Sequence, residues 1–309
     1  MDTVAVLMST FNGEKYLREQ IDSILNQKDI EVQLFIRDDG STDGTKMILN
    51  DYAAKFSNVH IEFGCNVGVG ESFMSLLYSV SDTFDFYSFS DQDDIWLENK
   101  LCESLKLLKQ DEHTLLYVSN QECVDREGVS LGLRWHKNDD RVFLNPEGIL
   151  SQNVLCGCTM VFTNKFCKML VDETVRPSSA VLRLKNHDGW IALIAAMSGA
   201  IIFDNNSYMK YRQHGENVVG AYKTGFRKKL KAKFKKLFHS ELRNYRSNTA
   251  RELCSKFPRL TCGFPLIEIC ANSKKCKGKR AILKNQKELR SYTGEGYMAF
   301  RLKVLFGLF

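Results

Sequence analysis

Three carboxylates stand within four positions in the stretch SFSDQDDIW, residues 88–96. Asp91, Asp93 and Asp94 repel one another unless something offsets their charge. Carboxylates at i and i+2 on a loop after a strand can point at one hard cation, because Mg²⁺ and Mn²⁺ take a few carboxylates and complete their shell with water and phosphate. The alternative is a solvated acidic turn that starts a helix over 95–108, since aspartate is favoured near helix N-termini. The spacing alone is compatible with both interpretations.

Other motifs of nucleotide or metal binding are incomplete. Counted from Asp91, an EF-hand loop would have Trp96 at its glycine position and no glutamate at its last position. Gly68 and Gly70 supply only two glycines of a dinucleotide fingerprint, because Phe73 stands in the third place. No GxxxxGK[ST] stretch occurs, which excludes a P-loop. The ten cysteines include no CxxC pair, which argues against a zinc site.

The composition is that of an ordinary globular protein, with 309 residues of which 44% are hydrophobic and 26% charged. The scattered cysteines predict reduced thiols of a cytosolic protein rather than a disulfide framework. The chain opens with a short strand, so no signal peptide is expected, and no apolar run approaches the ~20 residues of a membrane-spanning helix. The net charge of +6 arises from residues 217–240, which hold eight Lys or Arg and no Asp or Glu.

Apolar runs of strand type alternate with helical periodicity in the first hundred residues. Strands are expected over 3–8, 31–37, 59–63 and 84–89, and helices over 14–27, 45–55 and after the glycines near 68. This order predicts an α/β fold with a mainly parallel central sheet and flanking helices. Ligands of such sheets bind beyond the carboxyl ends of the strands. The polar turns 10–14, 38–43 and 91–94 each follow a strand, so we expect them to converge on one edge.

The pattern beyond residue 110 is more irregular. Strands are expected over 115–120 and 157–163, and a strand, a turn and a second strand over 201–214. An apolar helix is expected to begin at about Asp188, and the chain from residue 223 has a helical and basic pattern.

Seven blocks of the sequence, taken in order, resemble the family 2 glycosyltransferases of the GT-A fold. They are STFNGEKYLREQIDSILNQ (9–27), RDDGSTDGT (37–45), NVGVGESF (66–73), SDQDDIW (90–96), GCTMVF (157–162), HDGW (187–190) and QHGENVVG (213–220). The subgroup that they resemble most is the rhamnosyltransferase-type enzymes of bacterial surface polysaccharide assembly. The resemblance implies a nucleotide-sugar-binding half over 1–110 and an acceptor-binding half over 111–222. Residues 223–309 then form a C-terminal helical extension.

The resemblance also implies which residues hold the nucleotide-sugar donor. Asp39 would accept a hydrogen bond from the base N–H, although a turn with Gly40 is the alternative. Asn66, Gly68 and Ser72 would approach the donor, or else pack a helix closely on the sheet. The full set is Thr10, Phe11, Asn12, Glu14, Asp39, Asn66, Gly68, Ser72, Asp91 and Gln213.

A Mg²⁺ or Mn²⁺ ion is the implied cofactor, with Asp93 and Asp91 as ligands and His214 as a further candidate. Such a cation offsets charge on the leaving nucleoside diphosphate. Asp94 is left open between a ligand acting through water, an orienting residue and a helix cap. Asp188 is the implied catalytic base, which takes the proton of the acceptor hydroxyl in an inverting displacement. A helix N-cap beside His187 is the alternative for Asp188, and both roles can hold together.

The segment KTGFRKKLKAKFKKLFH, residues 223–239, places aromatic and leucine side chains at helical spacing among lysines. This pattern predicts a helix lying on an anionic membrane surface, with a helix packed on the catalytic domain as the alternative. A nucleic-acid arm has no recognised module to support it. The apolar and basic ending YMAFRLKVLFGLF is interpreted as a second interfacial contact.

The leading hypothesis is an inverting, metal-dependent glycosyltransferase on the cytoplasmic face of the cell membrane. It would move a hexose or deoxyhexose from a nucleoside-diphosphate sugar to a hydroxyl of a lipid-linked oligosaccharide during surface polysaccharide biosynthesis. One alternative is a nucleotidyltransferase of related fold, against which the lack of a Gly/Arg/Lys-rich phosphate loop counts. The other is a non-catalytic module that binds a sugar nucleotide or a membrane surface.

Overall fold

The computed structural model describes residues 1–309 except 81–82, 137–141, 143, 154, 215–243 and 308–309, and except the side chains of 184–186. The chain divides into two compact units. One, here called the sheet unit, comprises Met1–Asp139, Leu155–Asp172 and Ala200–Tyr222. The other, the helical unit, comprises Asp140–Val154, Glu173–Gly199 and Lys223–Phe309. The boundaries predicted at residues 110 and 222 stay a prediction about function, because compactness divides the chain differently.

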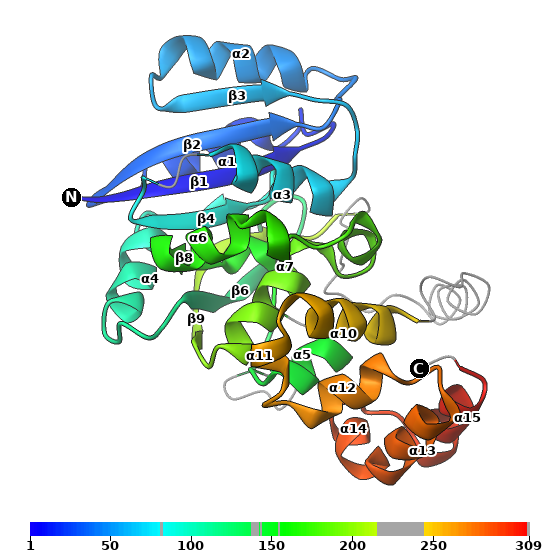
Figure 1. Ribbon diagram of the computed structural model, residues 1–309. Helices are drawn as coiled ribbons and strands as arrows, with labels where there is room; N and C mark the ends of the chain where they lie inside the picture. Colours follow the sequence, from blue (N-terminus) through cyan, green and yellow to red (C-terminus); the bar gives the residue numbers. More distant parts are fainter. Residues whose placement is uncertain (81–82, 137–141, 143, 154, 215–243, 308–309) are drawn as a thin grey trace. The chain divides into compact units, whose positions relative to one another are not determined.

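The sheet unit begins with the expected parallel strands. They are β1 (Asp2–Thr10), β2 (Ile30–Asp38), β3 (Val59–Phe63) and β4 (Phe86–Ser90), and they lie in the order β3-β2-β1-β4 (Figure 1). The register pairs Thr10 with Asp38 and Met8 with Ser90. The three strands β1, β2 and β4 therefore end together at one edge of the sheet, as the sequence predicted.

The sheet continues as a mixed sheet beyond β4. The added strands are β5 (Ile95–Trp96), β6 (Leu116–Val124), β7 (Ser130–Leu133), β8 (Val161–Thr163) and β9 (Ile201–Arg212). β8 joins antiparallel to β4 and to β6, while β9 runs parallel to β6 and pairs antiparallel with β5. Residues 201–212 form one strand with register shifts, where a turn was expected between two strands.

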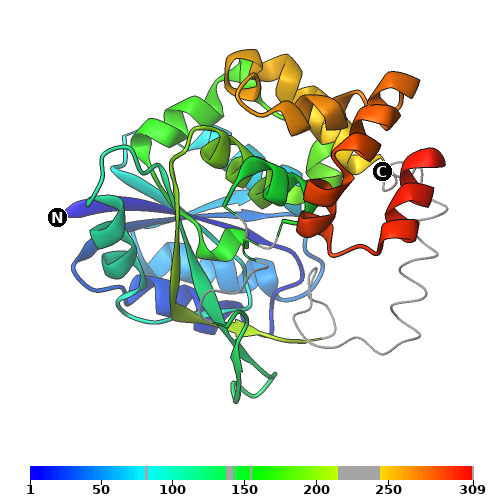
Figure 2. The ribbon, with the colours of Figure 1, turned by 90° about the horizontal axis from the view of Figure 1, so that it is seen from below.

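Helices cover both faces of this sheet because alternate residues of each strand point to opposite sides. One face buries Val4, Val6 and Met8 with apolar side chains of α1 (Leu17–Leu25), α2 (Thr45–Lys55) and α4 (Lys100–Leu108). Figure 2 shows α1 and α2, in blue, along the same side of the sheet. The other face carries a row of touching aromatic rings that links Phe73 of α3 (Val69–Ser79), Phe89, Phe162 and Phe166 of α6 (Asn164–Val171).

The helical unit is built from short helices around one longer one. They are α5 (Pro146–Ser151), α7 (Ser179–Met197), α10 (Tyr245–Lys256), α11 (Pro258–Thr261), α12 (Pro265–Ala271), α13 (Cys276–Lys284), α14 (Gln286–Thr293) and α15 (Tyr297–Leu305). Arg246 Nη2 and Tyr245 Oη donate to the carbonyl of Ser151, and the Trp190 ring lies 6.2 Å from that of Phe257. The described C-terminal helices thus share one core with α5 and α7. Among the described residues, no helix has both the length and the apolar character needed to cross a membrane.

Two predicted helix starts are wrong. The helix after the acidic residues begins at Lys100 rather than at 95, because Ile95 and Trp96 pair with β9 as a short strand. The helix expected from Asp188 begins at Ser179, since no breaker interrupts the preceding residues. Asp94 therefore does not cap α4, and Asp188 lies inside α7 rather than at its N-terminus.

Candidate functional site

The first loop, residues 10–14, is tied to the acidic loop, residues 91–94, by a single glutamine. Gln92 Oε1 accepts from Thr10 Oγ1 at 2.6 Å and from the Phe11 N–H at 2.9 Å. Gln92 Nε2 donates to the Phe11 carbonyl at 3.1 Å. A Cβ atom at Gly13 would collide with Gln92 Oε1, so a larger residue there would displace the Gln92 amide from Thr10 and Phe11. The sequence reasoning missed Gln92, although its place between the aspartates was the available signal.

The first loop is also tied to the second loop, residues 39–45. Asn12 Oδ1 accepts from the Thr42 N–H at 2.8 Å, and Glu14 Oε2 accepts from the Gly44 N–H at 2.9 Å. The side chains of Asn12 and Glu14 therefore shape the two loops. Phe11 is an aromatic member of the predicted set, and it is 44% exposed. Its ring is available to a ligand over these loops.

Asp39 lies at the centre of a buried cluster with Arg37. Asp39 Oδ1 accepts from Arg37 Nη1 at 2.5 Å and from the Val67 N–H, and its Oδ2 accepts from the Gly68 N–H at 2.9 Å. Arg37 Nη1 also donates to Ser72 Oγ at 3.0 Å. The structure thus brings together the predicted residues Asp39, Gly68 and Ser72. Each carboxylate oxygen can accept about two hydrogen bonds, so Oδ2 retains capacity for one more donor.

Asn66 lies in the loop that closes over this cluster. Its side chain is exposed, and its N–H stands 3.1 Å from the position that a Cβ of Gly40 would occupy. Gly40 has a φ of 85°, in the left-handed region that favours glycine. The turn at Gly40, which was the alternative interpretation of Asp39, is therefore present together with the buried cluster around Asp39.

The three carboxylates of the acidic loop lie beside two different side chains, His214 and Cys158. Asp93 Oδ2 lies 2.6 Å from His214 Nε2, so the structure joins two of the predicted metal residues. Asp91, Asp94 and Cys158 place their potential ligand atoms within 4.8 Å of one another. Asp94 was left open by the sequence, and the structure places it in this group.

Asp94 is fully buried beside like charges. Burial raises the pKa of its carboxyl well above the usual range, and the charges of Asp93 and Asp91 raise it further. Its Oδ1 accepts from the Arg212 N–H at 3.2 Å, while its buried Oδ2 has no hydrogen-bond partner among the residues that the structure describes. A divalent cation would relieve both costs, so the donor set fits Mg²⁺ or Mn²⁺.

Cys158 closes the inner side of this group. Burial and the neighbouring aspartates raise the pKa of its thiol well above the usual range. A thiol binds metal ions as the thiolate, which this environment disfavours. The carboxylates are therefore the ligands available to a hard cation, and Cys158 forms the wall behind them.

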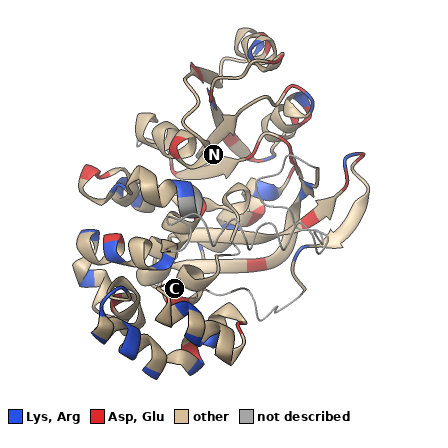
Figure 3. Ribbon diagram, turned by 90° about the vertical axis from the view of Figure 1, so that its right-hand side faces the viewer, with Lys and Arg blue, Asp and Glu red and all other residues tan. Residues whose placement is uncertain are grey.

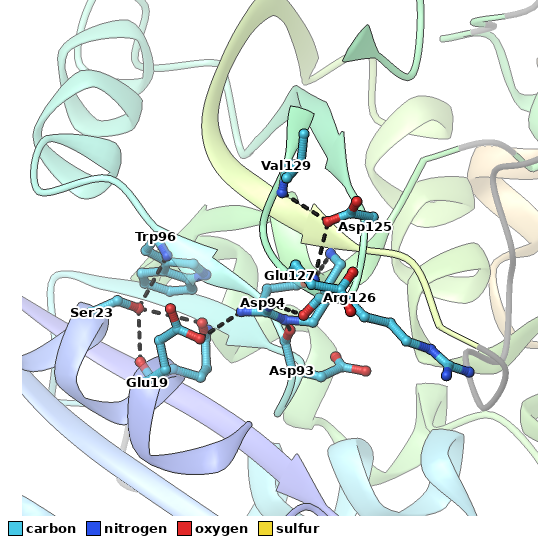
Figure 4. A network of polar contacts seen from close by, with 11 residues as sticks. Glu19, Ser23, Asp93, Asp94, Trp96, Asp125, Arg126, Glu127 and Val129 are labelled. Carbon is cyan, nitrogen blue, oxygen red and sulfur yellow. Dashed lines mark hydrogen bonds and ion pairs between the residues drawn. The ribbon is translucent and has the colours of Figure 1, made fainter. Parts of the chain in front are cut away.

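Arg212 joins the acidic loop to two other parts of the sheet unit, and sequence reasoning missed it. Its Nε donates to the Asp93 carbonyl at 3.1 Å, its Nη1 to the Arg126 carbonyl at 2.9 Å and its Nη2 to Glu19 Oε2 at 2.6 Å. Figure 4 shows Glu19, Asp93 and Arg126 around this junction. The guanidinium is buried and lies 4.6 Å from the ring of Tyr16. Its position directly before Gln213 and His214 was the available signal.

Lys100 is another buried basic residue of the sheet unit. Its Nζ lies 3.4 Å from the centre of the Trp96 ring. Burial lowers the pKa of Lys100 to about 7, and the neighbouring Cys158 and Asp94 oppose that shift. Trp96 is held in turn by its backbone N–H, which donates to Ser23 Oγ (Figure 4). The environment behind the acidic loop is therefore dry and aromatic.

Asp188 lies in the helical unit, half-buried inside α7. Its Oδ1 accepts from the Gly189 N–H at 2.5 Å. The neighbouring His187 is buried, which lowers its pKa to about 3 and keeps the imidazole neutral. Trp190 is a core residue, at 1% exposure. Gln213 is half-buried, with its Nε2 3.5 Å from the Arg212 carbonyl, while Asn217 and the basic segment 223–239 lie outside the described residues.

Comparisons with known proteins agree on one family. The model of "Glycosyl transferase family 2" matches residues 5–166. The chain is 29% identical over 240 residues to the dTDP-rhamnosyl transferase RfbG of Shigella flexneri, which covers 74% of this chain and 78% of that protein. It is 26% identical over 246 residues to the uncharacterized glycosyltransferase RT0329 of Rickettsia typhi, covering 74% and 72% of the two chains.

The fold has solved counterparts. The structure of S. aureus TarS 1-349 in complex with UDP-GlcNAc matches with a TM-score of 0.56 and 18% identity, over 100% of this chain and 89% of that chain. TarS 1-349 in complex with UDP matches with a TM-score of 0.53 and 17% identity, over 96% and 93%. The predicted GT-A type of α/β fold is confirmed by this likeness.

Replacing Arg212 by lysine should destabilise the protein although the charge is kept. An ammonium group cannot reach three partners in the planar fork that the guanidinium forms. We expect the free energy of unfolding to fall by about 2–4 kcal/mol, measured by denaturant unfolding. The matched control is Arg18→Lys, at the exposed pair with Asp51, which should cost less than about 1 kcal/mol. Equal losses in the two variants would contradict the role of Arg212.

Replacing Asp39 by asparagine should remove the buried counter-charge of the Arg37 guanidinium, which then keeps the half-exposed Glu62 as its ion-pair partner. The Arg37 and Asp39 side chains are both less than a tenth exposed, at 7% and 4%. Breaking such a pair costs roughly 3–5 kcal/mol. Asp51→Asn is the control, since it breaks the exposed pair with Arg18 and should change thermal unfolding little. If Asp39→Asn unfolds like the wild type, the cluster does not hold the loops.

Proposed function

The chain belongs to glycosyl transferase family 2 and is a glycosyltransferase, and we propose that it moves a hexose or deoxyhexose from a nucleoside-diphosphate sugar to a hydroxyl of an oligosaccharide. The observation that carries this proposal is the meeting of three loops at the carboxyl ends of β1, β2 and β4. A rhamnose-like donor is supported by the likeness to a dTDP-rhamnosyl transferase at 29% identity.

In this proposal the donor nucleotide lies over the first and second loops. The exposed ring of Phe11 can stack on a base, and Asp39 Oδ2 can accept its N–H. The side chains of Thr10, Asn12 and Glu14 hold the loops in the shape that receives it. Asn66, Gly68, Ser72 and Gln213 complete the proposed donor set.

The acidic loop would hold Mg²⁺ or Mn²⁺ through Asp91, Asp93 and Asp94, with His214 as a further ligand or as the partner that orients Asp93. A bound cation supplies charge stabilisation for the diphosphate that leaves. The chain itself contributes the positions of these carboxylates. Arg212 holds the backbone of Asp93, and Gln92 holds the loop to Thr10 and Phe11.

Asp188 is the proposed base of an inverting displacement. The acceptor oxygen would form its bond to the anomeric carbon as the bond to the diphosphate breaks, and the hydroxyl proton would pass to the Asp188 carboxylate. An aspartate inside α7 has no free N–H groups of a helix terminus around it. Its half-buried position, rather than the helix dipole, is what presents this carboxylate in the proposed mechanism.

We further propose that the acceptor is linked to a lipid and that the enzyme works on the cytoplasmic face of the cell membrane, in surface polysaccharide biosynthesis. The basic and amphipathic sequence of residues 223–239 supports an anionic membrane surface as partner. Nucleic acid is not a proposed partner, because the charge pattern comes without a recognised binding module.

The donor can be identified by incubating the protein with UDP-, GDP- and dTDP-sugars in the presence of Mg²⁺ or Mn²⁺. We expect a dTDP-deoxyhexose to be turned over fastest, with release of the nucleoside diphosphate. Asp93→Ala should lower turnover at least about 100-fold, since it removes a ligand of the cation and the partner of His214. Formation of a nucleoside triphosphate and a sugar 1-phosphate on addition of pyrophosphate would instead indicate a nucleotidyltransferase.

The control for this experiment is Asp111→Ala, which removes an exposed carboxylate after α4. It should leave turnover unchanged, and both variants should unfold at the temperature of the wild type. Turnover that survives EDTA at its normal rate would rule out the metal role.

Replacing Asp188 by asparagine should separate donor binding from transfer. We expect donor affinity, measured by calorimetry, to stay at the wild-type value while transfer to the acceptor falls by roughly 10²–10⁴-fold. Glu173→Gln changes an exposed carboxylate of the same unit and should affect neither quantity. Transfer retained by Asp188→Asn would assign the base to another residue.

A further inference from the structure

The last helix, α15, exposes a stripe of apolar side chains. Met298 is 65% exposed, Leu302 48%, Leu305 53% and the C-cap residue Phe306 74%. At about 100° per residue these four positions fall within an arc of roughly 100° on one side of the helix. The opposite side carries Phe300 and Val304, which are buried in the helical unit. This helix is therefore apolar on its outer face as well as its inner one.

Basic side chains border the stripe. The same helical geometry places Arg301 on one border of the arc and Lys303 on the other. Lys279 of α13 donates from its Nζ to the Leu305 carbonyl at 2.8 Å, which brings a third cation to the C-terminal end of the stripe. Long basic side chains at such borders can lay their stems along apolar material while their charges stay in water.

The surrounding helices carry the same sign of charge. Residues 265–309 contain ten Lys or Arg and three Asp or Glu. Figure 3 shows Lys and Arg recurring along these C-terminal helices. Lys277 and Arg280 of α13 are exposed and have no carboxylate within ion-pair distance among the residues that the structure describes. The region thus has unbalanced positive charge around an apolar stripe.

We propose that this stripe and its basic surroundings, here called the α15 face, lie against a lipid surface that carries anionic headgroups. Apolar side chains would enter the boundary of the acyl chains while Lys and Arg contact the headgroups. A second copy of the chain fits less well, because a symmetric contact would set the same basic region against itself. The inference rests on the proposed function, since a lipid-linked acceptor requires the enzyme to work at such a surface.

The test is sedimentation of the full chain with vesicles of phosphatidylcholine, with or without phosphatidylglycerol. The wild type should bind the anionic vesicles better. Met298→Ser/Leu302→Ser/Phe306→Ser should lower the partition coefficient at least about tenfold, because three exposed apolar side chains are lost without disturbing the buried side of α15. Lys277→Gln/Arg280→Gln should lower it about fivefold for each charge removed.

Salt separates the two contributions. Raising the salt from about 0.1 M to about 1 M shortens the Debye length from about 10 Å to about 3 Å and should weaken binding of the wild type and of the serine variant. The glutamine variant should respond less. Matched controls change the sheet unit instead, with Val129→Ser/Leu133→Ser for exposed apolar residues and Lys46→Gln/Lys55→Gln for exposed charge. They should bind vesicles like the wild type.

Hydrolysis of the donor, measured in solution on the same variants, keeps this inference separate from the proposed function. We expect the serine variant to hydrolyse donor like the wild type while it loses vesicle binding. A serine variant that sediments like the wild type overturns the proposal, and residues 223–239 would then be the candidate contact. A change of its mass in light scattering with unchanged vesicle binding overturns it too, and assigns the face to a second copy.

Discussion

The arrangement of the acidic loop depends on one buried guanidinium. The side chain of Arg212 donates to the backbone carbonyls of Asp93 and Arg126 and to Glu19. Its side chain thus holds the backbone under the aspartates. Two like charges about 4 Å apart repel by roughly 4 kcal/mol near a protein surface, so such crowding needs a rigid support. Asp93 Oδ2 faces His214 Nε2 and Asp94 Oδ1 accepts from the Arg212 N–H, while Asp91, Asp94 and Cys158 keep their potential ligand atoms within 4.8 Å of one another.

The same principle governs the loops beside it. The side chains of Asn12, Glu14 and Gln92 form hydrogen bonds with neighbouring loops. The Asp39 carboxylate accepts hydrogen bonds from Arg37 and from two backbone N–H groups. Polar residues of this kind lower the conformational freedom of a site before the ligand arrives, which reduces the cost of binding. Residues that stand out in the sequence blocks therefore shape the site at least as much as they face it.

The burial of ionisable side chains around the acidic loop lowers the stability of the folded protein. Lys100 and Asp94 are both fully buried, and burial shifts the pKa of each towards its neutral form. A site that gains affinity for a cation by concentrating negative charge is less favourable when the cation is absent. In the helical unit the unfavourable feature is apolar surface in water, because α15 has a buried apolar side and an exposed apolar side that basic residues border.

The sequence by itself determined the order β-α-β-α-β-α-β and the chemical type of the acidic loop. It also determined the shared edge of the sheet, where three strands end at Thr10, Asp38 and Ser90. These features follow from local periodicity and turn chemistry, which act over a few residues.

The tertiary structure decided what depends on distant residues. It placed β9 so that Arg212 and His214 meet Asp93, and it paired Ile95 and Trp96 with that strand, which moved the start of α4 to Lys100. It also extended α7 back to Ser179, so that Asp188 lies inside a helix rather than at its end. No local signal specifies such pairings, because they are set by the packing of segments more than a hundred residues apart.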